Sequence, residues 1–146
     1  MKKLFIVTVL TFILMSCSAQ PSEKEKEEKP TLDYDLIEDR IIEWDDVFKQ
    51  EENAYLVYFY SETCGHCKAI KQDVLTYYLK NEEIMYFVKN PDKDEYFAPT
   101  SYKIIGISTI EDLRIYGVPG LLEIVEHEIL NYHFGEKQIL DYLTVQ

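Results

Sequence analysis

Residues 55–68 read YLVYFYSETCGHCK. The first six residues, Tyr55 to Tyr60, form a continuous apolar and aromatic run, which is typical of a strand buried on both faces of a sheet. The run leads into Cys64-Gly65-His66-Cys67 and then into a segment with helical periodicity that opens at Lys68. The stretch therefore predicts a central strand that ends beside two thiols at the start of a helix.

Two thiols in this setting indicate thiol-disulfide exchange. The free backbone N–H groups and the positive end of the helix dipole stabilise a thiolate at a helix start, and the thiolate is the form that attacks a disulfide. We therefore expect Cys64 to attack and Cys67, three residues further on, to resolve the mixed disulfide. The chain holds three cysteines in all, and the remaining one, Cys17, belongs to a different feature.

The first sixteen residues have the pattern of an export signal. Lys2 and Lys3 precede an eleven-residue apolar run, Leu4 to Leu14. This is too short to cross ~30 Å of hydrocarbon, so the pattern favours a cleaved signal over a spanning helix.

Residues 14–17, Leu-Met-Ser-Cys, resemble the lipobox of bacterial lipoproteins, although Met15 departs from the commonest pattern. The resemblance implies cleavage before Cys17, a diacylglycerol on Cys17, and a protein anchored on the outer face of the cytoplasmic membrane. An ordinary secretory signal with a chance cysteine is the alternative. Residues 17–35, which include a run of Glu and Lys, are expected to be a flexible tether, and residues 36–146 one folded domain.

Charge limits the partners. The chain carries 15 basic and 27 acidic residues, a formal net charge of −12, and loss of the signal removes two lysines and no acid. Such a surface should repel nucleic acid, whose binding depends on Lys and Arg. We expect a monomer that exchanges disulfides with protein or peptide thiols and with a redox partner that the sequence does not name.

The remaining pattern predicts alternating elements. A helix over 67–80 should turn Ile70, Val74, Leu75, Tyr78 and Leu79 inward. Other expected elements are an edge strand at 40–42, a helix at 44–50, a strand at 84–88, a helix at 108–116, a hairpin of 121–125 with 129–134, and a helix at 136–143. Residues 92–107 show no clear period and could extend a substrate groove or cover a sheet edge.

This order of elements, with Cys-x-x-Cys opening a helix and Gly117-Val118-Pro119 before a hairpin, resembles the thioredoxin superfamily. The resemblance implies an α/β thioredoxin fold, a central mixed sheet flanked by helices with a C-terminal hairpin and helix. It assigns Cys64 as nucleophile, Cys67 as resolving thiol and Pro119 as a cis-proline whose neighbour Val118 faces the substrate. A trans proline that ends a helix is the alternative for Pro119.

The chain also departs from that family. Thr63 stands where a tryptophan usually precedes the first cysteine, and Tyr58 stands where many members bury an acidic residue beneath the second. A tyrosine is a poor proton acceptor at neutral pH. Glu62 or water is the expected substitute.

Gly65-His66 is the pair found between the cysteines of protein disulfide isomerases. His66 can stabilise the Cys64 thiolate and with it the reduced form, which would make the disulfide oxidising or isomerising. Alternatively, His66 is an exposed residue with little influence. No cofactor is expected beyond a Cys64–Cys67 disulfide.

Three other interpretations stay open. A zinc site could use the two cysteines with His127 and His133 of the hairpin, although Cys-x-x-Cys supplies only half of a tetrahedral site. An accessory protein could serve the export or maturation of one dedicated client. A reductase could supply electrons to a client such as a haem-attachment pathway.

Overall fold

The computed structural model describes residues 31–145. The predicted signal peptide, the lipobox with Cys17 and most of the predicted tether lie outside these residues. Among the residues that the structure describes, no helix is both long and apolar enough to span a bilayer.

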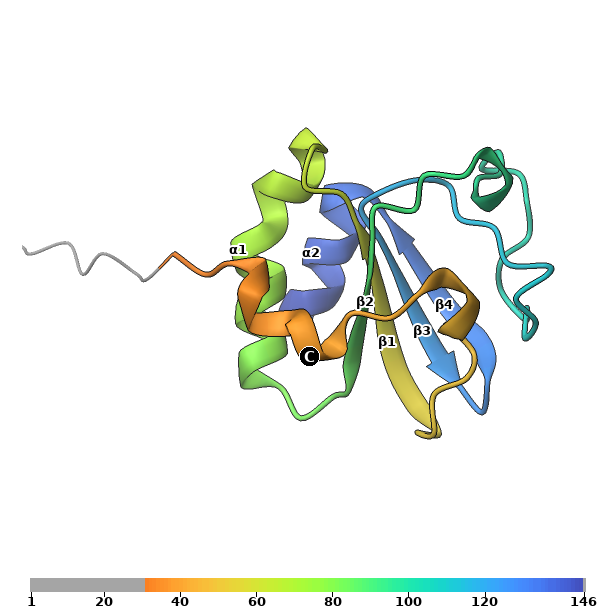
Figure 1. The fold of residues 1–146 in the computed structure, drawn as a ribbon, viewed down its shortest axis with the longest axis horizontal. Coiled ribbons are helices and arrows are strands. Elements are labelled where there is room, and N and C mark those ends of the chain that lie inside the picture. The colour runs from red at the N-terminus through yellow and green to blue at the C-terminus, as the bar shows by residue number, and fades with distance from the viewer. Residues whose placement is uncertain (1–30, 146) are drawn as a thin grey trace, which may run out of the picture.

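A four-stranded mixed sheet forms the centre of the molecule (Figure 1). The strands are β1 (Ala54–Tyr60), β2 (Met85–Lys89), β3 (Gly120–Val125) and β4 (Glu128–Phe134), in the spatial order β2-β1-β3-β4. β1 pairs parallel to β2 and antiparallel to β3, and β3 pairs antiparallel to β4. The predicted α/β architecture is confirmed, and so are the predicted central strand and hairpin.

β1 is central because nearly all of its side chains are buried. Leu56, Tyr58 and Tyr60 join the core between the sheet and its helices, whereas Tyr55, Val57 and Phe59 join a second core on the opposite face. This alternation follows from the two-residue period of a strand. The carboxyl end of β1 is thereby fixed from both faces, and the Cys-x-x-Cys segment follows directly from it.

Helices α1 (Gly65–Lys80) and α2 (Gly135–Val145) cover the same face of the sheet (Figure 1). The inward residues of α1 differ in part from the predicted set. Ile70, Val74 and Leu75 are buried, but Tyr77 is buried instead of Leu79, which is 53% exposed. The apolar stripe therefore turns away from the sheet in the last turn of the helix, where chain 81–84 leads back to β2.

The other face is covered by irregular chain, which contradicts two predicted helices. Residues 44–50 form only the short 3-10 helix η2 (Trp44–Asp46), and residues 108–116 form turns and a single bridge. The backbone of Ile115 donates to Tyr96 O at 2.9 Å and accepts from Ala98 N at 2.9 Å. Pairing with this distant segment competes with helical hydrogen bonds, and burial of Leu113 and Ile115 favours it.

Residues 92–107, which include the 3-10 helix η3 (Asp94–Tyr96), protect an edge of the sheet. Gly106 N donates to Ile129 O at 2.8 Å, and Ile129 N donates to Ile107 O at 2.9 Å. These bonds occupy backbone groups of the edge strand β4 that would otherwise be free to pair with another chain. Of the two roles considered for this segment, the structure shows the covering of an edge.

The folded part begins before the predicted boundary at residue 36. Leu32 exchanges two hydrogen bonds with the Gln72 side chain, at 2.8 and 2.7 Å, and the 3-10 helix η1 (Tyr34–Arg40) follows. The edge strand predicted at 40–42 is reduced to one parallel bridge between Ile41 and Phe87. Arg40 is instead the last residue of η1, which continues to the residue before this bridge.

The β3–β4 hairpin closes through a two-residue turn. Glu126 and His127 both have positive φ angles, 52° and 62°, which suits the right-handed twist of the flanking strands. The register shifts by one residue after Glu123. α2 then starts at Gly135, with Ile139 buried and Leu140 and Leu143 half-buried against the core.

A single added methyl group should test the packing at the start of β3. A Cβ on Gly120 would lie 2.9 Å from Tyr132 Oη and 3.1 Å from Gly117 O. We expect Gly120→Ala to lower the free energy of unfolding by about 1–3 kcal/mol, because the backbone oxygen cannot move aside easily. Urea denaturation measures this. Gly65→Ala is the matched control, since a Cβ there would meet no atom within 4 Å apart from its chain neighbours and the backbone of its own helix. Equal loss in both variants would contradict the steric explanation.

Candidate active site

Cys64 caps the N-terminus of α1. Its backbone is extended, with φ −75° and ψ 123°, its carbonyl accepts from Lys68 N at 3.1 Å, and its Sγ accepts from Cys67 N at 3.4 Å. A sulfur in this position faces the free N–H groups and the positive end of the dipole of a 16-residue helix. The local structure therefore supplies the electrostatic setting that a reactive thiolate needs.

The Val118–Pro119 loop lies against Cys64. The Val118–Pro119 peptide bond is cis, and Cys64 Sγ lies 3.6 Å from Val118 O, which accepts its hydrogen bond. Cys64 is partly exposed, and Val118 is half-buried. Two segments separated by 54 positions thus meet at one accessible sulfur atom.

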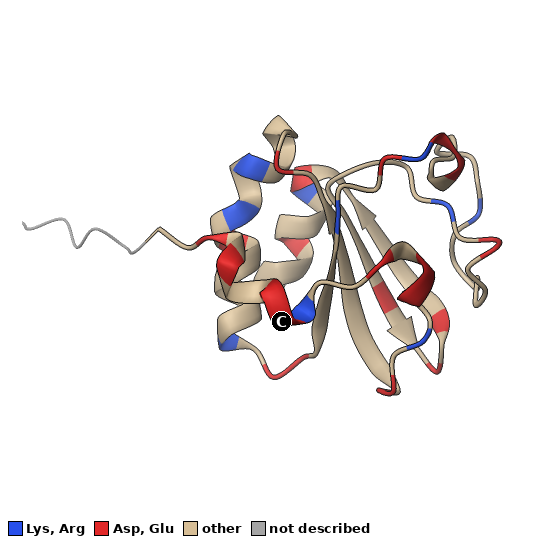
Figure 2. Cartoon of the chain, in the orientation of Figure 1, with Lys and Arg blue, Asp and Glu red and all other residues tan. Residues whose placement is uncertain are grey.

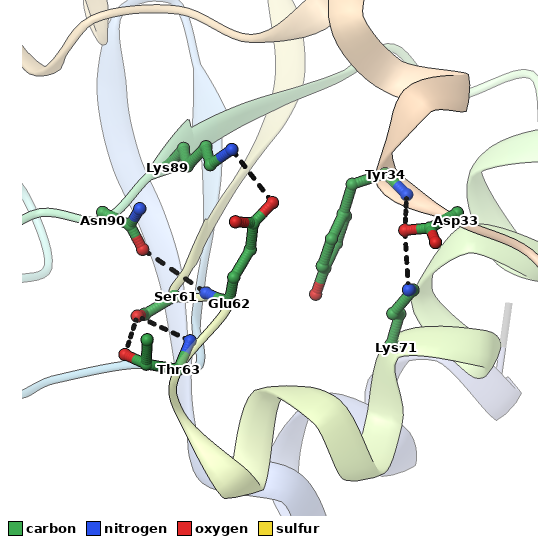
Figure 3. A network of polar contacts seen from close by, with 8 residues as sticks. All are labelled: Asp33, Tyr34, Ser61, Glu62, Thr63, Lys71, Lys89 and Asn90. Carbon is green, nitrogen blue, oxygen red and sulfur yellow. Dashed lines mark hydrogen bonds and ion pairs between the residues drawn. The ribbon is translucent and has the colours of Figure 1, made fainter.

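The loop between β1 and α1 is tied to the end of β2 (Figure 3). Asn90 N donates to Tyr60 O at 2.7 Å, and Glu62 N donates to Asn90 Oδ1 at 3.3 Å. The Glu62 carboxylate forms an ion pair with Lys89, with 2.9 Å between Glu62 Oε1 and Lys89 Nζ. Ser61 Oγ lies 3.0 Å from Thr63 Oγ1 and accepts from Thr63 N at 3.3 Å. These contacts hold the residues that precede Cys64 in one conformation.

Cys67 differs from Cys64 in its environment. Its side chain is fully buried in the core between the sheet and the helices, and both cysteines are free thiols. Burial raises the pKa of the Cys67 thiol well above its ordinary value, with the backbone N–H of Ser61 acting in the opposite direction. Cys67 is therefore held as a neutral thiol next to the accessible Cys64, which suits an attacking and a resolving partner.

Tyr58, which stands where many members of the family that the sequence resembles bury an acid, lies in the core cluster that contains Cys67. It is fully buried, and its hydroxyl has no hydrogen-bond partner among the described residues. Burial raises the pKa of Tyr58 far above its ordinary value. This side chain therefore cannot take over, as a base, the proton that a buried carboxylate would accept.

His66 makes a contact that the sequence did not predict. Its Nδ1 lies 2.6 Å from Glu136 Oε1, in the first turn of α2, and the His66 side chain is 77% exposed. Figure 2 shows basic residues in the first half of α1, which holds Lys68 and Lys71, amid a largely acidic surface. The first half of α1 therefore carries two lysines, of which Lys71 pairs with Asp33 at 2.7 Å, while His66 faces the Glu136 carboxylate.

Glu136 and Asn90 are the site residues that sequence reasoning missed. Glu136 follows Gly135, so its place at the start of α2 was predictable, but its distance to His66 depends on how α2 packs on α1. Asn90 follows β2 directly, and its positive φ of 49° is common for asparagine after a strand. Parallel pairing of β1 with β2 could have indicated that Asn90 lies beside Ser61 and Glu62.

The two histidines considered for zinc lie at opposite ends of β4. His127 is in the exposed hairpin turn and His133 is near the end of β4, where its ring lies 4.6 Å from that of Tyr142. Within residues 31–145 no group of three or more His, Cys, Asp and Glu side chains is arranged to hold a metal ion. His133 Nε2 is instead buried without a described partner.

A partly exposed thiol at a helix N-terminus, a buried thiol one turn on and a cis-proline loop against the first define a protein built for thiol-disulfide exchange. The family model "Thioredoxin" matches residues 36–117. The chain belongs to the thioredoxin family, whose membership indicates thiol-disulfide oxidoreductase activity with protein thiols and disulfides as partners.

Two solved structures are among those similar to this chain. Chlamydomonas reinhardtii thioredoxin f2 has a TM-score of 0.51 and 19% sequence identity, over 72% of this chain and 89% of that one. The long form of spinach chloroplast thioredoxin f has a TM-score of 0.49 and 12% identity, over 80% and 97% of the two chains. No curated protein sequence matches this chain. The family match and the thioredoxin f2 structure confirm the predicted thioredoxin fold.

His133 should make the stability of the fold depend on pH. Burial lowers the pKa of His133, and the Glu123 carboxylate opposes this only in part. The unfolded chain then binds more protons than the folded chain below the unperturbed pKa of about 6.5, so stability should fall as the pH falls from about 7 towards 5.

Urea unfolding across this range measures the effect. His133→Phe should flatten the slope, whereas His127→Asn, in the exposed turn, should keep it. The hydrogen bond from Lys71 lowers the pKa of Asp33 from an ordinary value that already lies below this pH range, so Asp33 does not contribute to the slope. An unchanged slope in His133→Phe would contradict the assignment.

Proposed function

We propose that this protein is a membrane-tethered thiol-disulfide oxidoreductase that acts on protein clients outside the cytoplasm. Cys64 attacks a client disulfide, or accepts attack by a client thiolate, and Cys67 closes or opens the internal disulfide. The contact between Cys64 Sγ and the Val118 carbonyl carries this proposal. It places the accessible sulfur beside a half-buried backbone segment on which an extended client chain could lie.

Substitution of each cysteine tests the chemistry. We expect Cys64→Ser to reduce insulin disulfides no faster than dithiothreitol alone, because the attacking sulfur is lost. Cys67→Ser should keep the first step and accumulate a mixed disulfide between Cys64 and the client. Insulin turbidity measures turnover, and non-reducing gels show the adduct.

Cys64→Ser is the control for the adduct, since Cys67 is buried and should not capture clients. Adducts of equal amount in both variants would contradict the assigned roles. The range of trapped clients also separates two functions: many clients support general disulfide exchange, and one client supports a dedicated accessory protein for export, maturation or haem attachment.

The Gly65-His66 pair supports an oxidising or isomerising direction. Protonated His66 would favour the Cys64 thiolate and hence the reduced form, and His66 Nδ1 lies 2.6 Å from Glu136 Oε1. Equilibration with glutathione gives the reduction potential. A value near about −180 mV supports this direction, and one near about −270 mV supports a reductase.

The membrane tether rests on the lipobox-like segment at residues 14–17. We expect radiolabelled palmitate to enter the protein in bacterial cells and to be lost in Cys17→Ala, because the thioether and amide acyl chains require that cysteine. Cys67→Ser is the matched control and should keep the label. An unlabelled wild-type protein would remove the anchor from the proposal while leaving the redox function intact.

A further inference from the structure

Three tyrosine hydroxyls lie in the core that contains Cys67 without any hydrogen-bond partner among the described residues. They belong to Tyr34 of η1 and to Tyr58 and Tyr60 of β1. Tyr58 and Tyr60 are completely buried, and Tyr34 is 8% exposed. Buried hydroxyls are normally paired, since an unpaired one costs free energy, so three in one cluster require an explanation.

The three rings form one stack. The centroids of Tyr34 and Tyr60 are 4.2 Å apart with planes inclined by 27°, and those of Tyr58 and Tyr60 are 6.0 Å apart and almost parallel at 9°. Tyr58 and Tyr60 are two residues apart on β1 and therefore point to the same face of the sheet. All three rings belong to the core cluster that contains Cys67, and a charge on Cys67 would act on Tyr34 and Tyr58.

Glu62 stands at the outer end of this cluster. Its carboxylate is about half exposed, it pairs with Lys89, and its charge acts on Tyr34 and Tyr60. Figure 3 shows the Tyr34 ring beside the Glu62 side chain above the first turns of α1, with the Tyr34 hydroxyl directed towards that helix and the Glu62 carboxylate towards Lys89. A proton that reaches this carboxylate can leave to solvent.

We propose that the hydroxyls of Tyr34, Tyr58 and Tyr60 form a relay that carries the proton of Cys67 to and from Glu62. The inference rests on the proposed function and replaces the single buried acid with a chain of neutral hydroxyls. Each hydroxyl accepts one proton while it gives up another, so none has to become a tyrosinate. Because the three hydroxyls make no hydrogen bond to one another among the described residues, the relay runs through bridging water molecules.

The step balances in both directions. When a client is reduced, the Cys67 S–H bond breaks and the proton passes along the hydroxyls to the Glu62 carboxylate. The electron pair left on Cys67 Sγ forms the bond to Cys64 Sγ, and the bond between Cys64 and the client breaks to release a client thiolate. When a client is oxidised, Cys67 leaves as a thiolate and receives the proton by the same route.

Stopped-flow reaction of excess reduced protein with 5,5′-dithiobis(2-nitrobenzoate) tests the relay. The first nitrothiobenzoate released reports attack by Cys64, and the second reports resolution by Cys67. We expect the variant with Phe at positions 34, 58 and 60 to slow the second phase by at least tenfold, a lower bound on the roughly 100-fold or larger loss that a missing proton-transfer step causes. The first phase should stay close to wild type. Glu62→Gln should slow the second phase as well.

Tyr55→Phe is the matched control. Tyr55 is equally buried, but it lies on the other face of β1 and donates to Val47 O at 2.9 Å. It should lose thermal stability without slowing the second phase. The triple variant should lose no thermal stability, because its missing hydroxyls had no partner among the described residues. It should also keep the wild-type redox potential, because a relay speeds the forward and the reverse reaction equally.

A second phase within threefold of wild type in the triple variant would overturn the relay. If that variant fails to fold, Tyr34→Phe and Tyr58→Phe give the same test singly, and an unchanged second phase in both would overturn it. A wild-type protein without a fast first phase would instead contradict the proposed function. The two failures are therefore distinguishable.

Discussion

The burial of β1 on both faces is the constraint on which the rest of the structure depends. A strand packed on one face can shift or twist towards solvent, but β1 is held by a core on either side and by hydrogen bonds to β2 and β3. A change of register by one residue would exchange the two sets of side chains between the cores. Its carboxyl end, and with it the position of Cys64, is therefore fixed by packing that involves most of the domain.

The same strand period decides what lies beneath the dithiol. Even-numbered residues of β1 face the helices, so Tyr58 and Tyr60 reach the core of Cys67, while Tyr55 on the other face finds a carbonyl for its hydroxyl. Large aromatic rings stabilise the core by burial and by stacking, each fully buried ring contributing on the order of 1.5–3 kcal/mol. The cost is a set of hydroxyls in a region with few polar partners. A packing requirement of the fold thus leads directly to the chemistry of the site.

Local sequence patterns predicted the parts of the fold that local forces decide. The run 55–60, the helix after Cys64 and the hairpin after Pro119 each have a strong period and clear end signals, and all are present. The helix predicted at 108–116 failed because Ile115 pairs with Tyr96 and Ala98, a contact that no period within the segment reveals. Tyr34 was assigned to the tether because the charged run before it dominates the composition, although its ring closes the stack on Tyr60.

In the site, too, features set by local sequence were predictable and features set by tertiary packing were not. The two cysteines and the proline loop were predictable from spacing and from the order of elements, whereas the pairing of His66 with Glu136 depends on the packing of α2 against α1.

The contrast between the two thiols follows from their places on one helix turn. Cys64 at the N-cap stays partly in solvent and faces the helix dipole, while Cys67, three residues on, must point into the core because the helix packs through that face. Burial keeps Cys67 protonated until a mixed disulfide forms, which protects the reduced site from losing its resolving proton early. The same burial makes removal of that proton the difficult part of the second step. A protein with this arrangement needs a proton path into its core, and the side chains that line that core decide how fast the disulfide closes.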